Sequence, residues 1–253
     1  MEHKAKMWFA YFTSSRYQDE ESFIPSERLV WSSQILSKSN EICVEVEVLL
    51  ANKGFTPKGY FIEGLSKDDG WQTYSIKTWG IEVKKSLENL PILNDIIKGN
   101  SNIVSVSINV LNPGGEIKGH YGDSNTFHRS HLGIQIPESL PNCGFRVNDE
   151  SRAWERGKLL TFSDSNYHSA WNYSNEKRVI VVFDVIKSQY ESRRRYICFR
   201  VRSFLILQLL FEKSNVIRKL PKFIHKIMGV LIVLMLFCIY PMQKITGTLK
   251  KHN

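Results

Sequence analysis

Cysteine is scarce in this chain of 253 residues, and its placement excludes two classes of protein. The four cysteines are widely separated, and no two of them form a CxxC pair. A zinc knuckle needs such pairs, and a disulfide-stabilised scaffold needs a denser cysteine pattern. Residues 1–23 also lack the continuous apolar run of a signal peptide. We therefore expect reduced thiols in a cytosolic domain.

An excess of positive charge is also lacking over most of the chain, although the net charge of the whole is +9. From Glu191 onward there are 13 Lys and Arg against 2 Asp and Glu, so the first 190 residues carry 21 basic and 23 acidic side chains. Such a near-neutral domain is not a basic nucleic-acid-binding protein. We predict a folded domain over residues 1–190 and a basic tail over 191–253.

Long apolar runs are absent except in this tail. Residues 227–242 are 16 uncharged, mostly apolar positions, whereas a spanning helix needs about 20. Extension back to Phe223 reaches that length by including a histidine and a lysine, and a lysine can extend its amine to the interface. A shorter apolar run over 203–211 lies among arginines, as in a helix on an anionic membrane surface. We predict a membrane-associated or transmembrane segment near 223–242; the alternative is that both runs are core helices packed on the domain.

Short segments that alternate between apolar and polar residues fill the second half of the domain. Turn residues separate them, and no helical pattern lies between them, which is typical of a sandwich or jelly roll. Trp71 to Gly80 is also strand-like, whereas residues 26–53, with Ser26 as an N-cap, and residues 86–100, around a proline, have helical spacing. We expect a mainly β domain with flanking helices. Its segments read "NIVSVSINVL", "HLGIQIP", "CGFRVND", "KLLTFSD" and "KRVIVVFDVI".

Two histidines bracket the strand-rich region. His120 follows a Pro-Gly-Gly turn in "NPGGEIKGHYGDSNTFHRSHLGIQIP", and His168 lies 48 residues later in "FSDSNYHSAW". This separation is consistent with two metal ligands on neighbouring strands. A single histidine in a strand is more often structural, however, so the neighbouring residues must decide between the two roles.

Those neighbours resemble a known family. The pattern PGG…HxG…RxHLG…WExGK…FxDS…HxxWN…R, together with the strand around Arg178, is similar to the aspartyl/asparaginyl β-hydroxylase family. The similarity extends from about Trp71 to Ile186. It implies an iron(II)- and 2-oxoglutarate-dependent dioxygenase with a double-stranded β-helix core, in which a facial set of ligands leaves positions for 2-oxoglutarate and O2.

The resemblance implies that His120 and His168 are the two protein ligands of iron. Many non-haem iron oxygenases add a carboxylate two residues after the first histidine, but this position is Gly122, a glycine that the family shares, and the resemblance implies that water takes its place. Asp123 is one residue too late, because on a strand it would point to the opposite face. Asp164 could hold that water or orient an imidazole; an ordinary turn aspartate is the alternative.

The resemblance also assigns 2-oxoglutarate to a second set of residues. Arg129 and His131 match positions near the iron, and they share one face of a strand because they are two residues apart. Arg178 matches the arginine that binds the distal carboxylate, where a guanidinium can form a bidentate pair. Asn109 and Trp71 match further contacts, although the family member used for comparison has serine at the position of Asn109.

The sequence leaves the substrate open between two classes. The resemblance implies hydroxylation of the β-carbon of Asp or Asn in a peptide or protein, and we expect this activity first. The alternative is a hydroxylase of fatty-acyl chains of a membrane lipid, which the basic, apolar tail favours. A catalytically silent, membrane-tethered binding domain is a third possibility. We expect a membrane-associated protein with its domain in the cytoplasm and no nucleic-acid partner.

Overall fold

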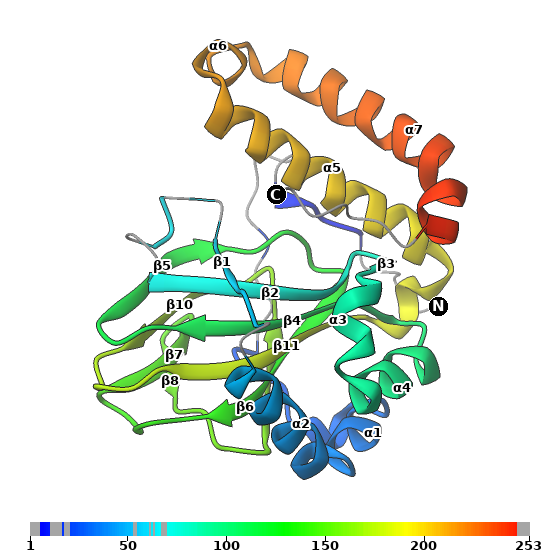
Figure 1. The fold of residues 1–253 in the computed structure, drawn as a ribbon. Helices are drawn as coiled ribbons and strands as arrows, with labels where there is room; N and C mark the ends of the chain where they lie inside the picture. The colour runs from blue at the N-terminus through cyan, green and yellow to red at the C-terminus, as the bar shows by residue number, and fades with distance from the viewer. Residues whose placement is uncertain are drawn as a thin grey trace.

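Two antiparallel sheets face each other in the computed structural model, and a pair of long helices lies across one end of them (Figure 1). The structure describes residues 6–10, 17, 21–52, 55–60, 62, 64–66 and 70–246, with the side chains described as far as 243. Most of residues 1–23, where we expect no signal peptide, and residues 247–253 of the predicted tail lie outside the described residues.

The larger sheet has seven strands, and the strand nearest the C-terminus lies in its middle. The order is β1–β2–β4–β11–β6–β9, and β3 pairs with β2. All of these pairs are antiparallel. The strands are β1 (Lys58–Gly59), β2 (Trp71–Thr78), β3 (Ile81–Glu82), β4 (Ile103–Leu111), β6 (Phe127–Gln135), β9 (Leu159–Ser163) and β11 (Arg178–Ile186).

The smaller sheet has four strands in the order β5–β10–β7–β8. From β4 to β11 the chain passes repeatedly from one sheet to the other, so consecutive strands rarely pair with each other. This alternation is the topology of a jelly roll. The predicted cupin-like, mainly β core is therefore confirmed. The strands of this sheet are β5 (Gly115–Tyr121), β7 (Cys143–Val147), β8 (Glu150–Arg152) and β10 (Tyr167–Asn172).

The larger sheet is covered on both faces. Helices α1 (Ser32–Leu36), α2 (Ser39–Ala51), α3 (Lys84–Glu88) and α4 (Pro91–Gly99) lie against its outer face (Figure 1). Aliphatic side chains of α2 and α4 join those of β4 and β11 in one core. The inner face meets the smaller sheet across a second, more aromatic core. Eight of the nine residues of β11 are buried because its strand is enclosed in this way.

Two expected helix boundaries are wrong. Ser26 does not cap a long helix, because it begins a short 3-10 turn, η2 (Ser26–Arg28), and α2 begins only at Ser39. The segment around Pro91 is two helices rather than one. Leu90, before the proline, has φ −136° and ψ 62°, outside the helical region. A residue that precedes proline avoids that region, and proline suits the first helical turn, where α4 begins.

The tail forms a helical hairpin that packs on the domain. After η4 (Ser188–Arg193) the chain continues into α5 (Arg194–Lys213), α6 (Asn215–Arg218) and α7 (Lys222–Thr246). Ile197 and Val201 of α5 are buried against Trp79 and Phe127 of the domain. Helix α5 is thus a core helix, as the alternative expectation had it, whereas α7 contacts mainly α5. The domain boundary at residue 190 stays a prediction.

This packing predicts different outcomes for two truncations. A chain that ends after Ser214 keeps α5, so its unfolding should stay cooperative in urea. A chain that ends after Tyr190 loses Ile197 and Val201 from the core, and each buried aliphatic side chain contributes about 1.5–3 kcal/mol. The shorter chain should therefore unfold at a clearly lower urea concentration. Equal midpoints for the two chains would show that α5 does not belong to the core.

Candidate active site

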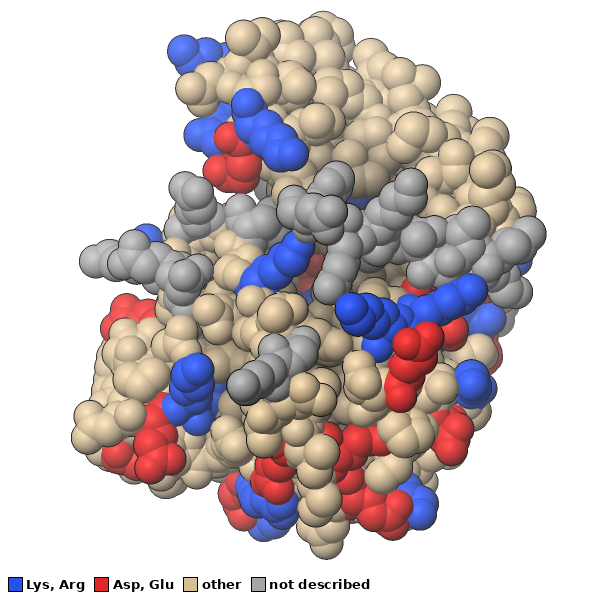
Figure 2. All heavy atoms as spheres, in the orientation of Figure 1, with Lys and Arg blue, Asp and Glu red and all other residues tan. Residues whose placement is uncertain are grey.

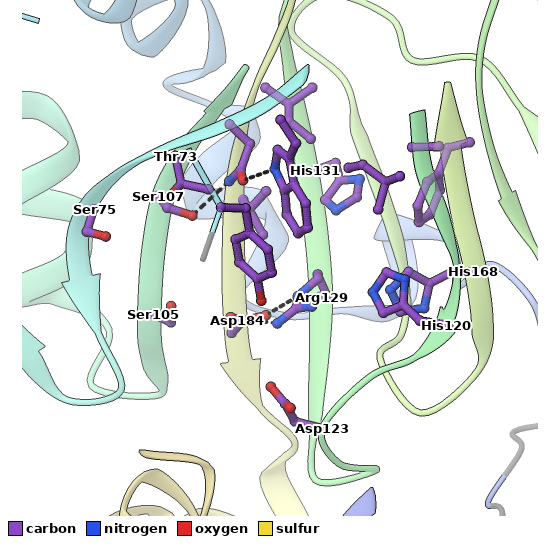
Figure 3. Close-up of a pocket in the computed structure, with 18 of the residues that line it drawn as sticks. Thr73, Ser75, Ser105, Ser107, His120, Asp123, Arg129, His131, His168 and Asp184 are labelled. Atoms are coloured by element: carbon purple, nitrogen blue, oxygen red, sulfur yellow. Dashed lines mark hydrogen bonds and ion pairs between the residues drawn. The ribbon is translucent and has the colours of Figure 1, made fainter. Parts of the chain in front are cut away.

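A cavity of about 250 Å³ lies between the two sheets. The larger sheet provides polar side chains from β2, β4, β6 and β11, and the smaller sheet provides two imidazoles (Figure 3). All of the site residues predicted from the sequence line this cavity except Asp164. The jelly-roll topology therefore brings together residues that are more than 100 positions apart, such as Trp71 and Arg178.

His120 and His168 face each other because β5 and β10 pair with these two residues directly opposite. Their ring centroids are 4.3 Å apart. Each Nδ1 is 2.8 Å from a backbone carbonyl oxygen, that of Lys118 for His120 and that of Asn166 for His168. A carbonyl oxygen only accepts, so each Nδ1 carries the proton and each Nε2 keeps a lone pair. Two neighbouring ring nitrogens with free lone pairs are suited to bind one metal ion.

Burial keeps both imidazoles neutral. Desolvation lowers the pKa of His120, and desolvation together with the neighbouring His120 lowers the pKa of His168 well below its usual value. Phe162 and Phe145 provide the apolar surroundings, with ring centroids 5.0 Å and 5.9 Å from that of His168. Neutral imidazole is the form that binds a metal ion.

Asp164 occupies the space that a side chain at Gly122 would need. A Cβ atom built on Gly122 would overlap the Asp164 carboxylate. That carboxylate is fully buried, accepts a hydrogen bond from the backbone N–H of Asp123 at 2.6 Å, and lies 2.5 Å from Nη1 of Arg129. Asp164 is therefore more than a turn aspartate. Its carboxylate lies where a side chain at position 122 would lie. Asp164 itself belongs to the connection between β9 and β10.

Arg129 holds two carboxylates at this end of the cavity. Its Nε donates to Asp184 at 2.7 Å (Figure 3), and its Nη1 pairs with Asp164. Burial opposes the charge of Arg129, but the two carboxylates together raise its pKa. Burial, followed by the charge of Asp164, raises the pKa of the neighbouring Asp123 to about 7. The charge of Arg129 is thus compensated by protein groups.

The expectation that Asp123 points away from the site is wrong. Strand β5 ends at Tyr121, so the alternation of a strand does not extend to Asp123. Its side chain lines the cavity below Arg129 (Figure 3).

His131 is a hydrogen-bond donor toward the cavity. The indole Nε1–H of Trp154 donates to its Nδ1 at 3.2 Å. Since Nδ1 accepts, the proton of the neutral ring is on Nε2. Burial, assisted by the charges of Arg178 and Arg129, lowers the pKa of His131 well below its usual value, so the ring stays neutral. A neutral donor at this position suits a ligand oxygen.

Arg178 is a buried cation without an anionic partner in the described part of the chain. It is 1% exposed, its guanidinium lies 4.5 Å above the Trp154 ring, and its Nε and Nη1 have no hydrogen-bond partner there. Desolvation lowers its pKa to about 10, so it is still charged at pH 7. Burying an unpaired charge is costly. The geometry therefore indicates that a small anion binds at this end of the cavity.

Trp71 and Asn109 lie in the cavity wall but bond to each other. The Trp71 Nε1–H donates to the Asn109 side-chain oxygen at 2.9 Å, and the Asn109 amide donates to the Ser107 hydroxyl at 2.8 Å. The Tyr60 ring stacks on Trp71 with a centroid distance of 3.8 Å. One amide hydrogen of Asn109 is left for a ligand, whereas the Trp71 indole N–H is already used.

The residues present fit a ferrous ion that has non-protein ligands. Across the described residues no group of three or more His, Cys, Asp or Glu is arranged to hold a metal. Two imidazole nitrogens alone leave most positions of an octahedral ion free for a chelating co-substrate, dioxygen and water. The unpaired guanidinium of Arg178 in the same cavity matches the anionic end of such a co-substrate.

Sequence reasoning did not find two of the residues in this cavity. Asp184 forms the ion pair with Arg129, and Tyr60 stacks on Trp71. Trp154 is expected from the sequence to be a core or pocket-wall aromatic residue, and it contacts both His131 and Arg178. Asp184 carried a usable signal, because it is a single acidic residue within the apolar run "RVIVVFDVI". Tyr60 carried none, since it lies outside the regular elements.

Comparison with known proteins agrees with the family resemblance found in the sequence. Residues 37–188, more than half of the chain, match the family model described as Aspartyl/Asparaginyl beta-hydroxylase. The ornithine lipid ester-linked acyl 2-hydroxylase of Rhizobium tropici is 25% identical over 161 residues, which cover 62% of this chain and 57% of that protein. The aspartyl/asparaginyl beta-hydroxylase of Mus musculus is 27% identical over 146 residues, which cover 54% of this chain and 19% of that protein.

Matches to solved structures have low sequence identity and low TM-scores. The viral collagen prolyl hydroxylase of Paramecium Bursaria Chlorella virus-1, in its 2OG complex, is 13% identical with a TM-score of 0.36, and the match covers 56% of this chain and 90% of that chain. The Cnp3 cupin domain of Schizosaccharomyces pombe is 10% identical with a TM-score of 0.36, covering 56% and 75%.

The unpaired Arg178 predicts an unusual stability effect. Replacing it with Met removes a buried charge, so the ligand-free Arg178→Met protein should melt a few degrees higher than the wild type; each 1 kcal/mol corresponds to about 2–4 °C in a chain of this size. The wild type, but not the variant, should gain stability when 2-oxoglutarate is added. Differential scanning fluorimetry measures both effects, with the exposed Arg146→Met as control. A lower melting temperature for Arg178→Met without ligand would contradict this account of the site.

Proposed function

The chain belongs to the aspartyl/asparaginyl β-hydroxylase family, whose members are 2-oxoglutarate-dependent hydroxylases, and from this premise we propose that it hydroxylates an unactivated C–H bond with iron(II), 2-oxoglutarate and O2. The single observation that carries the proposal is Arg178, a buried cation without an anionic partner in the described residues, in the same cavity as two facing imidazoles. The chain spans about half of the Rhizobium tropici relative and a fifth of the mouse relative.

His120 and His168 would hold the iron through their Nε2 atoms. Ferrous iron, when bound, supplies the oxidation by O2 that couples decarboxylation of 2-oxoglutarate to succinate with hydroxylation of the substrate. The chain keeps both imidazoles neutral by burial and fixes their tautomers through the carbonyl oxygens of Lys118 and Asn166. Asp164 occupies the space beside Gly122, two residues after His120. It would accept a hydrogen bond from a water next to the iron.

Arg178 would bind the distal carboxylate of 2-oxoglutarate. Its guanidinium can form a bidentate, charge-assisted pair with that group. His131 would donate from Nε2 to an oxygen of the same molecule, because Trp154 already occupies Nδ1. Arg129 keeps its two carboxylate partners, so its proposed role is to hold Asp164 and Asp184 in place beside the co-substrate. Asn109 would contribute its remaining amide hydrogen, and Trp71 a wall.

A catalytically silent binding domain is the less suitable interpretation. A domain that only binds a partner would gain nothing from an unpaired buried guanidinium, which reduces stability. Two adjacent imidazoles with free Nε2 atoms would equally serve no purpose there. Consumption of 2-oxoglutarate in the presence of ferrous iron, without any prime substrate, distinguishes the enzyme from such a binder.

For the substrate, we propose the β-carbon of Asp or Asn in a peptide or protein. The second candidate is an acyl chain of a membrane lipid, and one observation favours it. Leu205 of α5 lines the cavity, and α7, which packs on α5, exposes an apolar face. The cavity wall and an apolar surface thus belong to the same hairpin. The relative from Rhizobium tropici is named for a lipid substrate.

Substitution of the two kinds of site residue should affect different kinetic constants. His120→Ala or His168→Ala removes half of the protein ligands, so succinate production should be abolished. Arg178→Ala should mainly raise the KM for 2-oxoglutarate, by about 30-fold or more, because losing one partner of a buried charged pair costs about 2–5 kcal/mol. The measurement is succinate formation against 2-oxoglutarate concentration, with the exposed Arg152→Ala as control. Full turnover by His168→Ala would remove the case for that ligand.

Mass spectrometry separates the two substrate classes. After incubation with iron and 2-oxoglutarate, Asp- or Asn-containing peptides should gain one oxygen atom. The matched arm contains lipid vesicles and the same enzyme, and the His168→Ala protein is the blank in both arms. Oxidation confined to the lipid acyl chains would replace the peptide proposal with the second candidate, whereas succinate without any oxidised product would leave only uncoupled turnover.

A further inference from the structure

One face of α7 is apolar and exposed along almost the whole helix. Leu231 is 58% exposed, Leu234 56% and Met242 68%. Ile227, Leu231, Leu234 and Cys238 recur at intervals of three and four residues, so they lie on one face of the helix. Figure 2 shows this part of the molecule as an almost uninterrupted tan surface above the domain. An apolar patch of this kind marks an interaction site. The exposed large apolar residues of α7 are Phe223, Ile227, Val230, Leu231, Leu234, Met235, Phe237 and Met242.

The opposite face of α7 is held against α5. Val233 and Leu236 are buried with Phe199 of α5. Arg202 of α5 donates to the side chain of Gln243 at 2.9 Å near the end of α7. At the start of α7, the His225 ring lies 2.8 Å from the carbonyl oxygen of Ile217. The hairpin is therefore closed at both ends as well as along its seam.

This closed hairpin does not fit a spanning helix. If α7 crossed a bilayer beside α5, the charged side chains of α5 would enter the hydrocarbon, where each costs about 2.5–3.5 kcal/mol or more. The domain that packs on the other face of α5 would also have to enter the bilayer. Helix α7 could cross the bilayer only if it separated from α5, and this separation would expose the contact around Leu236. The charged residues of α5 are Arg194, Arg195, Arg200, Arg202, Glu212 and Lys213.

Helix length does not distinguish the two arrangements. Lys222 to Gln243 is long and apolar enough to cross a membrane by length and composition, but only 22% of its most apolar stretch is buried in the structure. Twenty helical residues extend about 30 Å whether the helix stands upright or lies flat. What distinguishes the two arrangements is the element that packs on the buried face of α7, and that element is α5.

Positive charge gathers where α5 turns into α7. Five basic residues lie between positions 213 and 226, and the nearby Glu212 is engaged by Arg218 at 3.3 Å. Figure 2 shows basic side chains at this end of the hairpin. Lys222 and Lys226 lie on the exposed side of α7 itself. Basic residues beside an apolar helix face are attracted to anionic lipid headgroups. The five are Lys213, Arg218, Lys219, Lys222 and Lys226.

We propose that α7 lies in the plane of an anionic membrane, with its exposed face inserted between the headgroups and the acyl chains and with the α5–α7 hairpin closed. In this arrangement α5 takes the place of the polar face of an ordinary interfacial helix. The catalytic domain stays in water and is held at a fixed height above the bilayer. The proposal does not depend on the hydroxylase activity, because it rests on the hairpin alone.

Vesicle flotation tests the surface. The full chain should float with vesicles of phosphatidylcholine and phosphatidylglycerol, and less with phosphatidylcholine alone. Leu231→Ser and Leu234→Ser should each weaken binding about tenfold or more, since a buried leucine contributes about 1.5–3 kcal/mol. The matched control is Val48→Ser, an apolar residue of α2 that is 66% exposed on the far side of the domain. Unchanged flotation of the α7 variants, or no flotation of the wild type, would overturn the proposal.

Depth measurement separates lying from spanning. Cys238 is exposed whereas Cys43, Cys143 and Cys198 are buried, so it accepts a fluorophore selectively. Ile227→Cys and Leu234→Cys, each made in a Cys238→Ser chain, add two more label sites on the same face. Lipids brominated at shallow or deep positions should quench all three labels alike and mainly from the shallow position. Strongest deep quenching at 234, in the middle of the helix, would show a spanning helix and overturn the in-plane arrangement. Succinate production by each variant shows separately that the catalytic domain is intact.

Discussion

The antiparallel pairing of β5 with β10 is the constraint on which the site depends. It sets His168 opposite His120, and each ring then reaches a carbonyl oxygen two residues earlier in its own chain segment. Backbone register therefore sets the distance between the rings, whereas the local backbone of each segment fixes the tautomer of its own ring. A slip of one residue would turn one ring to the other face of the sheet. The remaining parts of the cavity are arranged around this pair.

Charge is distributed unevenly along the cavity. At one end Arg129 meets two carboxylates, so the cation and its partners neutralise each other within the protein. At the other end Arg178 lies over the face of Trp154 and has no anionic partner among the described residues. An anion that enters the cavity is therefore attracted toward Arg178, while the Arg129 cluster offers it little. This difference would orient a diacid with one carboxylate toward Arg178 and the other toward the imidazoles.

Much of the fold and part of the site could be predicted from the sequence. The alternating segments indicated the jelly roll, since strand alternation is a local property. The proposed roles of the histidines and arginines came from the resemblance of their motifs to a known family. Contacts between segments that are distant in the sequence could not be predicted from local patterns or motifs. The pairing of Asp184 with Arg129 depends on which strands become neighbours, and so does the overlap of Asp164 with the space beside Gly122. The helical tail shows the same limit, because two apolar runs cannot reveal from composition alone that one of them packs on the other.

The position of Asp164 restricts how the proposed metal site could change. A single substitution of Gly122 by aspartate would not add a third protein ligand, because the new side chain would collide with a carboxylate that already fills the space. That carboxylate cannot simply be removed either, since it neutralises Arg129. Conversion of the proposed site to two imidazoles and a carboxylate would therefore need at least two replacements, one at Gly122 and one at Asp164.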